Sequence, residues 1–348
     1  MRRRHFHRIL GAGVAGAALA PFACAAVRDV PVSENVIKPR RLKQGDTVAL
    51  ISPGSYAPDD AVQKAYLNLE GLGLKVKPGK YLRAQRGFTA GSDQQRLDDL
   101  HAAFSDTEAS AVWCVRGGYG CTRLLPFIDY PLIRQNPKIL IGYSDITALL
   151  QAIHIETGLV GFHGPVASAT FTDYAKGQLI KVLMEPAAMH TIPVAESQKE
   201  KKDSEYQPVT INEGKAEGIL SGGNLSLLAA MAGTPHAFDF TNKLVFIEEV
   251  GERPYRLDRM LTTLLQASNL RKAAGVALGV FTDCQPKKDE LSLSMMDTLR
   301  DRLEGLGIPV VYGLSFGHIS DNCTLPVGIS ASLDVQQRSI TILETPVL

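Results

Sequence analysis

Short apolar runs that alternate with helix-type patterns restrict the fold of this chain more than any other feature of its sequence. Thr47–Ser52, Ala111–Val115 and Ile139–Ile141 are apolar runs of strand length, and a glycine-containing turn follows each of them. Helical spacing covers Ala57–Leu72, after the first run. Strands that alternate with helices pair in parallel through right-handed crossovers. Residues 45–170 are therefore predicted to form an open, mainly parallel α/β domain.

A polar stretch of mixed charge at 197–205 interrupts this alternation, and residues 171–207 are predicted to be a connecting segment. Beyond it, strand-like runs such as Leu244–Ile247 and Gly275–Phe281 alternate with helical patterns, and short strands and turns end the chain. We therefore expect residues 208–348 to form a second, smaller domain of mixed α+β type.

Composition excludes several classes of protein. The 348 residues are 45% hydrophobic, which is too apolar for an intrinsically disordered chain. The 37 basic and 36 acidic side chains nearly balance, whereas nucleic-acid binding needs a basic face. The cysteine spacing matches no metal motif, and Cys114 and Cys284 lie in or beside apolar runs, where buried free thiols are common. We predict no metal, no cofactor and no nucleic-acid partner.

The N-terminus has the layout of an export signal. Basic residues at Arg2–Arg8 precede the short apolar run Ile9–Ala20, and their paired arginines resemble a twin-arginine signal. We predict a signal at 1–25, a tether at 26–44 and a periplasmic mature protein with no stable membrane span. Removing the signal removes four arginines and no acids, which leaves a net charge of −3. There are two alternatives. Cys24 could carry a lipid anchor, although the residues before it match the lipobox poorly, or the segment could be retained as a membrane anchor.

The sharpest local motif is Gly142-Tyr143-Ser144-Asp145, where an apolar strand turns into a predicted helix. This arrangement lifts the Ser144 hydroxyl above the carboxyl edge of the sheet, beside the unpaired N–H groups of a helix N-terminus. The motif is an incomplete G-x-S-x-G pattern, because Ile146 replaces the last glycine. The segment alone is compatible with a nucleophile or with a helix N-cap.

A glycine-rich turn, Arg116-Gly117-Gly118-Tyr119-Gly120, follows the Ala111–Val115 strand. Consecutive glycines let backbone N–H groups approach a ligand closely, as an oxyanion hole requires. The turn matches neither phosphate-binding glycine pattern. Because it follows the carboxyl end of a strand, it is expected to face the same crevice as Ser144. The alternative is an ordinary connection from strand to helix.

A serine nucleophile needs a base and an acid that orients the base. His318 lies in a loop after an apolar strand, and His163 also follows a strand, so both are candidates for the crevice. Glu248 and Glu249 end the Leu244–Ile247 strand and point to opposite faces, so one of them can reach the site.

Several segments in the same order together resemble the serine LD-carboxypeptidase family, which includes the microcin-immunity peptidases. The similarity covers nearly the whole chain from about Leu42. The matching segments are Val112–Gly120, Gly142–Asp145, Gly222–Ser226, Phe246–Arg256 and Phe316–His318.

This resemblance implies a catalytic triad of Ser144, Glu248 and His318. It also implies an oxyanion hole formed by the backbone N–H groups of Asp145 and of Gly117-Gly118. The N-terminal domain would carry the nucleophile and the C-terminal domain the glutamate and histidine. The active site would therefore lie in the cleft between the domains, in a homodimer.

The implied reaction releases terminal D-Ala from a peptidoglycan-derived tetrapeptide at an L,D bond. Arg116 is predicted to bind the free carboxylate, and Trp113 and Asn224 are the other predicted substrate-binding residues. Two features depart from the family: Glu249 stands where many relatives have Asp, and well-known murein-recycling members are cytoplasmic. The alternatives are a peptidase of the same fold acting on a peptide-nucleotide antibiotic, and a non-catalytic periplasmic binding protein.

Overall fold

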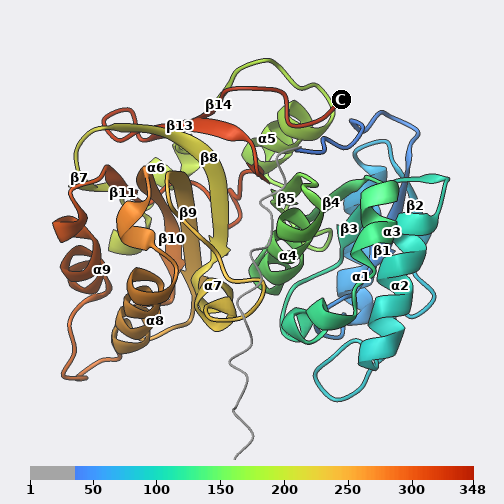
Figure 1. Cartoon of the computed structure of the whole chain (residues 1–348), viewed down its shortest axis with the longest axis horizontal. Coiled ribbons are helices and arrows are strands. Elements are labelled where there is room, and N and C mark those ends of the chain that lie inside the picture. The colour runs from blue at the N-terminus through green and yellow to red at the C-terminus, as the bar shows by residue number, and fades with distance from the viewer. Residues whose placement is uncertain (1–35) are drawn as a thin grey trace, which may run out of the picture. The chain divides into compact units, whose positions relative to one another are not determined.

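Two β-sheets organise the part of the chain that this computed structural model describes, residues 36–348 (Figure 1). The predicted signal and the first part of the predicted tether lie outside the described residues. The first sheet has six strands in the spatial order β12 (Leu325–Val327), β5 (Gly161–His163), β4 (Ile139–Gly142), β3 (Ala109–Cys114), β1 (Thr47–Ile51) and β2 (Lys75–Pro78). All neighbours in it pair in parallel except β12, which is antiparallel to β5.

Helices connect the strands of the first sheet, as the alternating pattern predicts. They are α1 (Asp59–Glu70), α2 (Asp93–Ser105), α3 (Tyr130–Gln135) and α4 (Thr147–Thr157), with the 3₁₀ turns η1 (Cys121–Arg123), η2 (Leu125–Phe127) and η3 (Ser144–Ile146). Helix α5 (Asp173–Leu183) follows β5 and leads away from this sheet. Ser92 begins α2 with a reciprocal capping box, in which its hydroxyl accepts from Gln95 N–H and the Gln95 side chain accepts from Ser92 N–H.

The second sheet has eight strands. Its spatial order is β6 (His190–Ile192), β14 (Ser339–Ile342), β13 (Ser330–Asp334), β8 (Lys215–Asn224), β9 (Lys243–Val250), β10 (Gly275–Thr282), β11 (Val310–Tyr312) and β7 (Val209–Asn212). The four central strands β8, β9, β10 and β11 pair in parallel, each with the next. The pairs on either side of them, which involve β6, β14, β13 and β7, are antiparallel.

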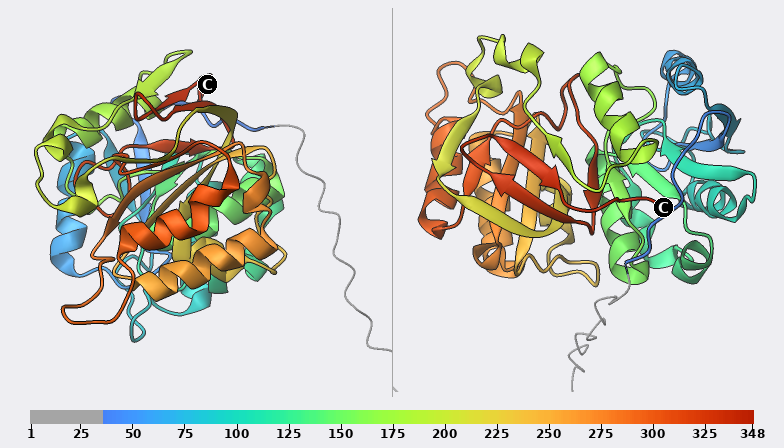
Figure 2. Two further views of the ribbon diagram at one scale, coloured as in Figure 1. Left: turned by 90° about the vertical axis from the view of Figure 1, so that its left-hand side faces the viewer. Right: turned by 90° about the horizontal axis from the view of Figure 1, so that it is seen from above.

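Helices α8 (Pro254–Ala267) and α9 (Met295–Leu303) lie together on one face of the second sheet (Figure 2). Helix α8 buries a leucine stripe, Leu257, Leu261, Leu264 and Leu265, which is the helical periodicity that its sequence predicts. The other elements are α6 (Glu196–Lys199), α7 (Leu225–Met231), η4 (Ser204–Tyr206), η5 (Leu270–Lys272) and η6 (Glu304–Leu306). No helix within residues 36–348 has both the length and the apolar character needed to cross a bilayer.

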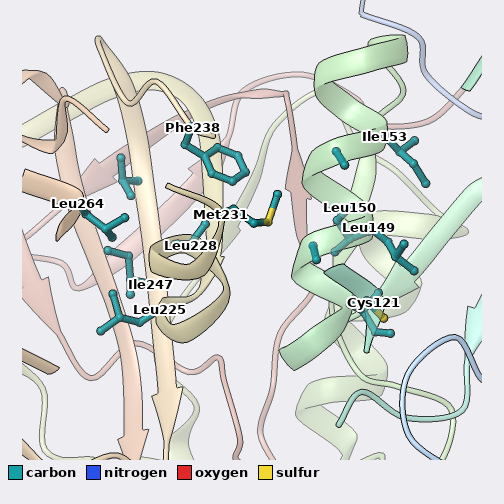
Figure 3. Close-up of a cluster of buried hydrophobic side chains, with 14 of the residues drawn as sticks. Cys121, Leu149, Leu150, Ile153, Leu225, Leu228, Met231, Phe238, Ile247 and Leu264 are labelled. Atoms are coloured by element: carbon teal, nitrogen blue, oxygen red, sulfur yellow. The ribbon is translucent and has the colours of Figure 1, made fainter. Parts of the chain in front are cut away.

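The two sheets share a continuous core, with α4 and α7 facing each other between them (Figure 1). Leu149, Leu150 and Ile153 of α4 belong to the same buried cluster as Leu225, Leu228 and Met231 of α7 (Figure 3). Polar contacts cross the same boundary, because the N–H of Asn224 donates to Thr147 Oγ1 over 3.0 Å. This packing fixes the position of one sheet against the other.

Two strands differ from the domain boundaries that the sequence predicts. The segment at 171–207 contains α5 and β6, and β6 pairs with β14 in the second sheet. From the predicted C-terminal domain, β12 joins the edge of the first sheet. Both strands have only three residues, so neither has enough alternation to predict its partner. Cys114 and Cys284 are buried free thiols, as predicted.

Candidate active site

Ser144 lies at a sharp turn between β4 and the helix that follows it. It begins η3 with a φ of 64°, a left-handed conformation that is uncommon for a residue other than glycine. Ser144 is half-buried, and a serine in a left-handed conformation between a strand and a helix is the backbone geometry of a nucleophile elbow. The N-cap of η3 is Tyr143 and that of α4 is Ile146, so Ser144 is the N-cap of neither helix.

The glycine-rich turn after β3 lies directly against this elbow. Because β3 and β4 are parallel, with Trp113 opposite Ile141, their following turns meet at the same edge of the sheet. A Cβ at Gly117 would lie 2.9 Å from Ser144 Cβ and 3.1 Å from the nitrogen of Asp145. Among residues 36–348, the N–H groups of Gly117, Gly118 and Asp145 donate to no protein acceptor. Three backbone donors are therefore available beside the serine.

Neighbouring backbone and side chains hold the glycine turn in place. Ser55 N–H donates to the carbonyl of Gly117 over 3.0 Å, and Ser55 Oγ accepts from Tyr119 N–H over 3.0 Å. The carboxylate of Asp145 accepts from Cys121 N–H over 2.9 Å, which ties the elbow to η1. Burial raises the pKa of Asp145 above its ordinary value. The two turns therefore form one hydrogen-bonded unit.

Arg96 of α2 braces the same unit from within the protein. Its side chain is fully buried, and Nη1 donates to the carbonyls of Pro53 and Gly120 over 2.6 and 3.0 Å. Nη2 pairs with Asp93. Arg96 was not among the predicted site residues, because an arginine inside an amphipathic helix has no local signal that it will be buried.

The second sheet supplies a carboxylate and an imidazole. His318 Nδ1 lies 2.7 Å from Glu248 Oε2, and the Glu248 side chain is completely buried. A bridge between Val280 and Gly317 brings the His318 loop to the carboxyl end of β10, beside the end of β9. The ring of His318 packs edge-on against Tyr143, the residue before Ser144, with centroids 4.8 Å apart. The Glu248–His318 pair of the second sheet thus contacts the residue next to Ser144 in the first sheet.

The glutamate and the histidine shift each other's pKa in opposite directions. Burial alone raises the pKa of Glu248, but the facing imidazole of His318 outweighs burial, so this pKa lies below its ordinary value. Burial alone lowers the pKa of His318, but the carboxylates of Glu248 and Glu249 outweigh it, so this pKa lies above its ordinary value. The pair thus favours an ionised glutamate that orients and stabilises a cationic imidazole.

Glu249 points to the opposite face of β9 from Glu248, because side chains alternate between the two faces along a strand, and it has different partners. Its carboxylate accepts from Ser226 N–H and Oγ–H over 2.8 and 2.6 Å, from Asn224 Nδ2 over 3.0 Å and from Val250 N–H over 2.9 Å. Burial raises its pKa. These contacts anchor the start of α7, so Glu249 supports the fold while Glu248 faces His318.

The predicted substrate-binding residues occupy three different environments. Trp113 has no exposed surface, and its indole N–H donates to Pro165 O over 2.9 Å, so the prediction of a substrate contact is corrected here. Asn224 is only 3% exposed, with its amide oxygen capping Leu227 N–H and its amide nitrogen on Glu249. It therefore shapes the site without reaching into it. The polar side chain of Asn224 and the aromatic side chain of Trp113 gave no indication in the sequence that both residues would be buried.

Arg116 is half-buried beside the glycine turn. Its Nη1 donates to the carbonyl of Tyr56 over 3.3 Å, and within residues 36–348 it forms no ion pair with a carboxylate. A guanidinium in this position can still bind an external carboxylate with two parallel hydrogen bonds.

Comparisons with known proteins place this arrangement in a family. The model of the LD-carboxypeptidase N-terminal domain matches residues 48–164, and that of the LD-carboxypeptidase C-terminal domain matches residues 217–333. The chain belongs to the LD-carboxypeptidase family. It is accordingly a serine-type peptidase, and the two matched regions contain the elbow and the Glu248–His318 pair respectively.

Relatives in this family span nearly the same length. A protein of Bacillus subtilis described as a probable murein peptide carboxypeptidase is 42% identical, over 88% of this chain and 94% of its own. The murein tetrapeptide carboxypeptidase of Pseudomonas aeruginosa is 35% identical, over 82% of this chain and 92% of its own. A structure of MccF with glutamyl sulfamoyl guanosine has a TM-score of 0.80 at 26% identity, and covers 89% of this chain and 99% of MccF. These likenesses support LD-carboxypeptidase activity.

Proposed function

We propose that this LD-carboxypeptidase hydrolyses an L,D peptide bond in a murein tetrapeptide and releases the terminal D-Ala. The observation that carries the proposal is the 2.7 Å contact between His318 Nδ1 and Glu248 Oε2 beside the Ser144 elbow. With Nδ1 held by the carboxylate, the imidazole has Nε2 free to accept the serine proton. The names of the murein-directed relatives support the choice of substrate.

In the proposed mechanism, Ser144 Oγ attacks the scissile carbonyl while His318 takes its proton. The tetrahedral oxyanion accepts hydrogen bonds from the N–H groups of Gly117, Gly118 and Asp145. His318 then donates its proton to the nitrogen of the leaving D-Ala, and an acyl-enzyme ester forms on Ser144. Water, deprotonated by His318, attacks the ester, and the proton returns to the serine as the shortened peptide leaves.

Removal of a single terminal residue requires recognition of its free carboxylate. We propose that Arg116 binds this carboxylate, since it lies next to the proposed oxyanion donors and pairs with no described acid. Arg116→Gln is expected to raise KM about tenfold or more, because a charge-assisted hydrogen bond is lost. Arg256→Gln is the matched control, because Arg256 is exposed and already pairs with Glu252.

The direct test incubates the protein with a tetrapeptide and follows D-Ala by mass spectrometry. Ser144→Ala is expected to lower turnover by about 10⁶-fold while leaving the fold intact, as in comparable triads. Ser105→Ala, an exposed serine at the end of α2, serves as the control. If the wild-type protein releases no D-Ala, or if Ser144→Ala releases it undiminished, the proposal is wrong.

A second candidate is hydrolysis of a peptide-nucleotide conjugate, which the likeness to MccF favours. Trp113 is buried and cannot stack on a nucleobase, so tyrosines would have to provide the stacking surface. Parallel assays with the tetrapeptide and with an aminoacyl sulfamoyl nucleoside separate the two candidates. The family membership does not favour a non-catalytic binding protein.

We also propose that the protein is exported to the periplasm and acts there as a homodimer. The arginine-rich start of the sequence supports export, and the family resemblance supports the dimer. Replacement of Arg3 and Arg4 by lysine is expected to leave the precursor in the cytoplasm, as cell fractionation would show. Light scattering of the purified protein gives its mass in solution.

A further inference from the structure

His163 is a buried histidine that the proposed reaction does not use. It ends β5, opposite Gly142 at the end of β4, and has no exposed surface. Neither ring nitrogen has a hydrogen-bond partner among the described residues. Burial lowers its pKa to about 4, so the ring is neutral and offers one N–H donor and one acceptor. Buried polar groups are nearly always paired, so two unpaired nitrogens in one side chain require an explanation.

The ring lies among the residues of the candidate active site. Its centroid is 6.0 Å from that of Tyr143 and 5.2 Å from that of Phe246, which precedes Glu248 by two positions on the same face of β9. The charged or titratable groups that face it are Glu248, His318 and Tyr143. His163 and His318 therefore both contact the ring of Tyr143, and His163 is the fully buried one of the two.

Other buried polar atoms of the neighbouring segments are also unpaired among the described residues. Oε1 of Glu248 is buried and accepts no hydrogen bond from a described residue, although Oε2 is bound by His318. Thr324 Oγ1 is buried without a partner next to Gly164, the residue after His163. Asn322 Nδ2 is likewise unpaired, while its Oδ1 accepts from the N–H of Gly317. A buried water molecule is stable where two to four polar groups surround it, and unpaired atoms of this kind are the partners that such a water needs.

We propose that His163 is a positioning residue, whose ring N–H is joined through one buried water to Oε1 of Glu248 and fixes the carboxylate that orients His318. The inference rests on the proposed function, since it assigns His163 a role in the same reaction. A carboxylate held at both oxygens cannot rotate, and the Nδ1–H of His318 then keeps a single direction. The donor at Oε1 also withdraws charge from Oε2, which limits how far Glu248 raises the pKa of His318.

The test compares His163→Phe, which keeps a planar aromatic ring but cannot form hydrogen bonds, with His163→Asn, which keeps an amide donor. His163→Phe is expected to lower kcat about 10- to 100-fold, the worth of one hydrogen bond to a charged group, with KM unchanged. The pKa of His318, followed by NMR titration of its ring, is expected to rise. His163→Asn is expected to have a kcat and a His318 pKa that lie between those of His163→Phe and those of the wild type. Ser268→Ala is the control, because its hydroxyl is also buried and unpaired among the described residues but lies at the far end of α8.

A wild-type kcat in His163→Phe, or a reduced kcat with an unshifted titration of His318, overturns the inference in favour of packing alone. If His163→Phe does not fold, Thr324→Val decides, since it removes another predicted partner of the water and keeps the side-chain shape. The same two readouts then apply, with a smaller effect in the same direction. The titration needs no substrate, so it still tests His163 if the wild-type protein proves inactive on tetrapeptides and the proposed function fails.

Discussion

Adding one methyl group at Gly117 is predicted to disable the proposed oxyanion hole while leaving the protein folded. The new Cβ would lie 2.9 Å from Ser144 Cβ, 3.0 Å from Tyr143 O and 3.1 Å from Asp145 N. Non-bonded carbon atoms pack at about 3.5–4.0 Å, so the turn must move by roughly 0.5–1 Å. Two of the three atoms are backbone, and the third is attached directly to it, so no flexible side chain can absorb the strain.

A shift of this size affects activity more than stability. A displacement of about 1 Å costs about 10²-fold in rate, and loss of one oxyanion donor costs about 10²–10³-fold. We therefore expect Gly117→Ala to lower kcat by about 10²–10³-fold with little change in KM, because the oxyanion exists only in the transition state. Overpacking is expected to lower the free energy of unfolding by about 1–3 kcal/mol.

The assay is the initial rate of D-Ala release, together with urea unfolding of the same preparations. Gly177→Ala is the matched control, because Gly177 lies within α5 and an added Cβ there meets nothing within 4 Å. It should keep full activity and gain about 0.5–1 kcal/mol of stability from the helix preference of alanine. If Gly117→Ala folds and keeps kcat within about twofold of wild type, the assignment of this turn to the oxyanion hole is wrong.

Four further predictions concern charged groups and thiols. Glu249→Gln is expected to lower the free energy of unfolding by about 2–4 kcal/mol in urea, because the amide nitrogen would face hydrogen-bond donors, whereas Glu217→Gln on the exposed side of β8 should change nothing. Because His318 must be neutral to accept a proton and its pKa is raised above 6.5, kcat/KM is expected to fall as the pH drops through that raised value. The Glu248–His318 pair should stabilise the fold most at pH values between the lowered pKa of Glu248 and the raised pKa of His318. This stabilisation is lost as the pH rises through the raised pKa of His318, and it is also lost as the pH falls through the lowered pKa of Glu248. Glu248→Gln should abolish both of these changes in the free energy of unfolding with pH. The four described cysteines are buried, and burial raises their thiol pKa, so a thiol reagent should label them only after denaturation; rapid labelling of the native protein would contradict this.

Local sequence patterns were sufficient to predict the turns of the candidate site that directly follow a strand. The Ser144 elbow and the glycine turn follow buried strands with clear apolar runs, so their shared edge follows from parallel pairing alone. The role of Glu249 could not be predicted in the same way. The alternation of side chains along a strand places Glu248 and Glu249 on opposite faces, but it does not show which face holds His318.

Long-range pairing and burial account for what the sequence did not predict. Strand β8 has a glycine pair, Gly222-Gly223, which interrupts any strand pattern, yet a Cβ at Gly222 would collide with the backbone of Phe246. Here glycine permits close approach to β9. Trp113 and Arg96 show the same limit, because their chemical types are typical of sites and surfaces while the fold encloses both.

The short strand β12 has a consequence for the order in which the molecule is made. It completes the edge of the first sheet, yet it comes from residues 325–327, after almost every other element has been synthesised. A nascent chain that already contains β1 to β5 therefore still lacks one edge of that sheet, and an exposed edge strand invites wrong pairing. Assembly of the first sheet has to wait for the last fifteenth or so of the chain. Truncation from the C-terminus should consequently damage both halves at once, and a peptidase made this way stays inactive until its synthesis is nearly finished.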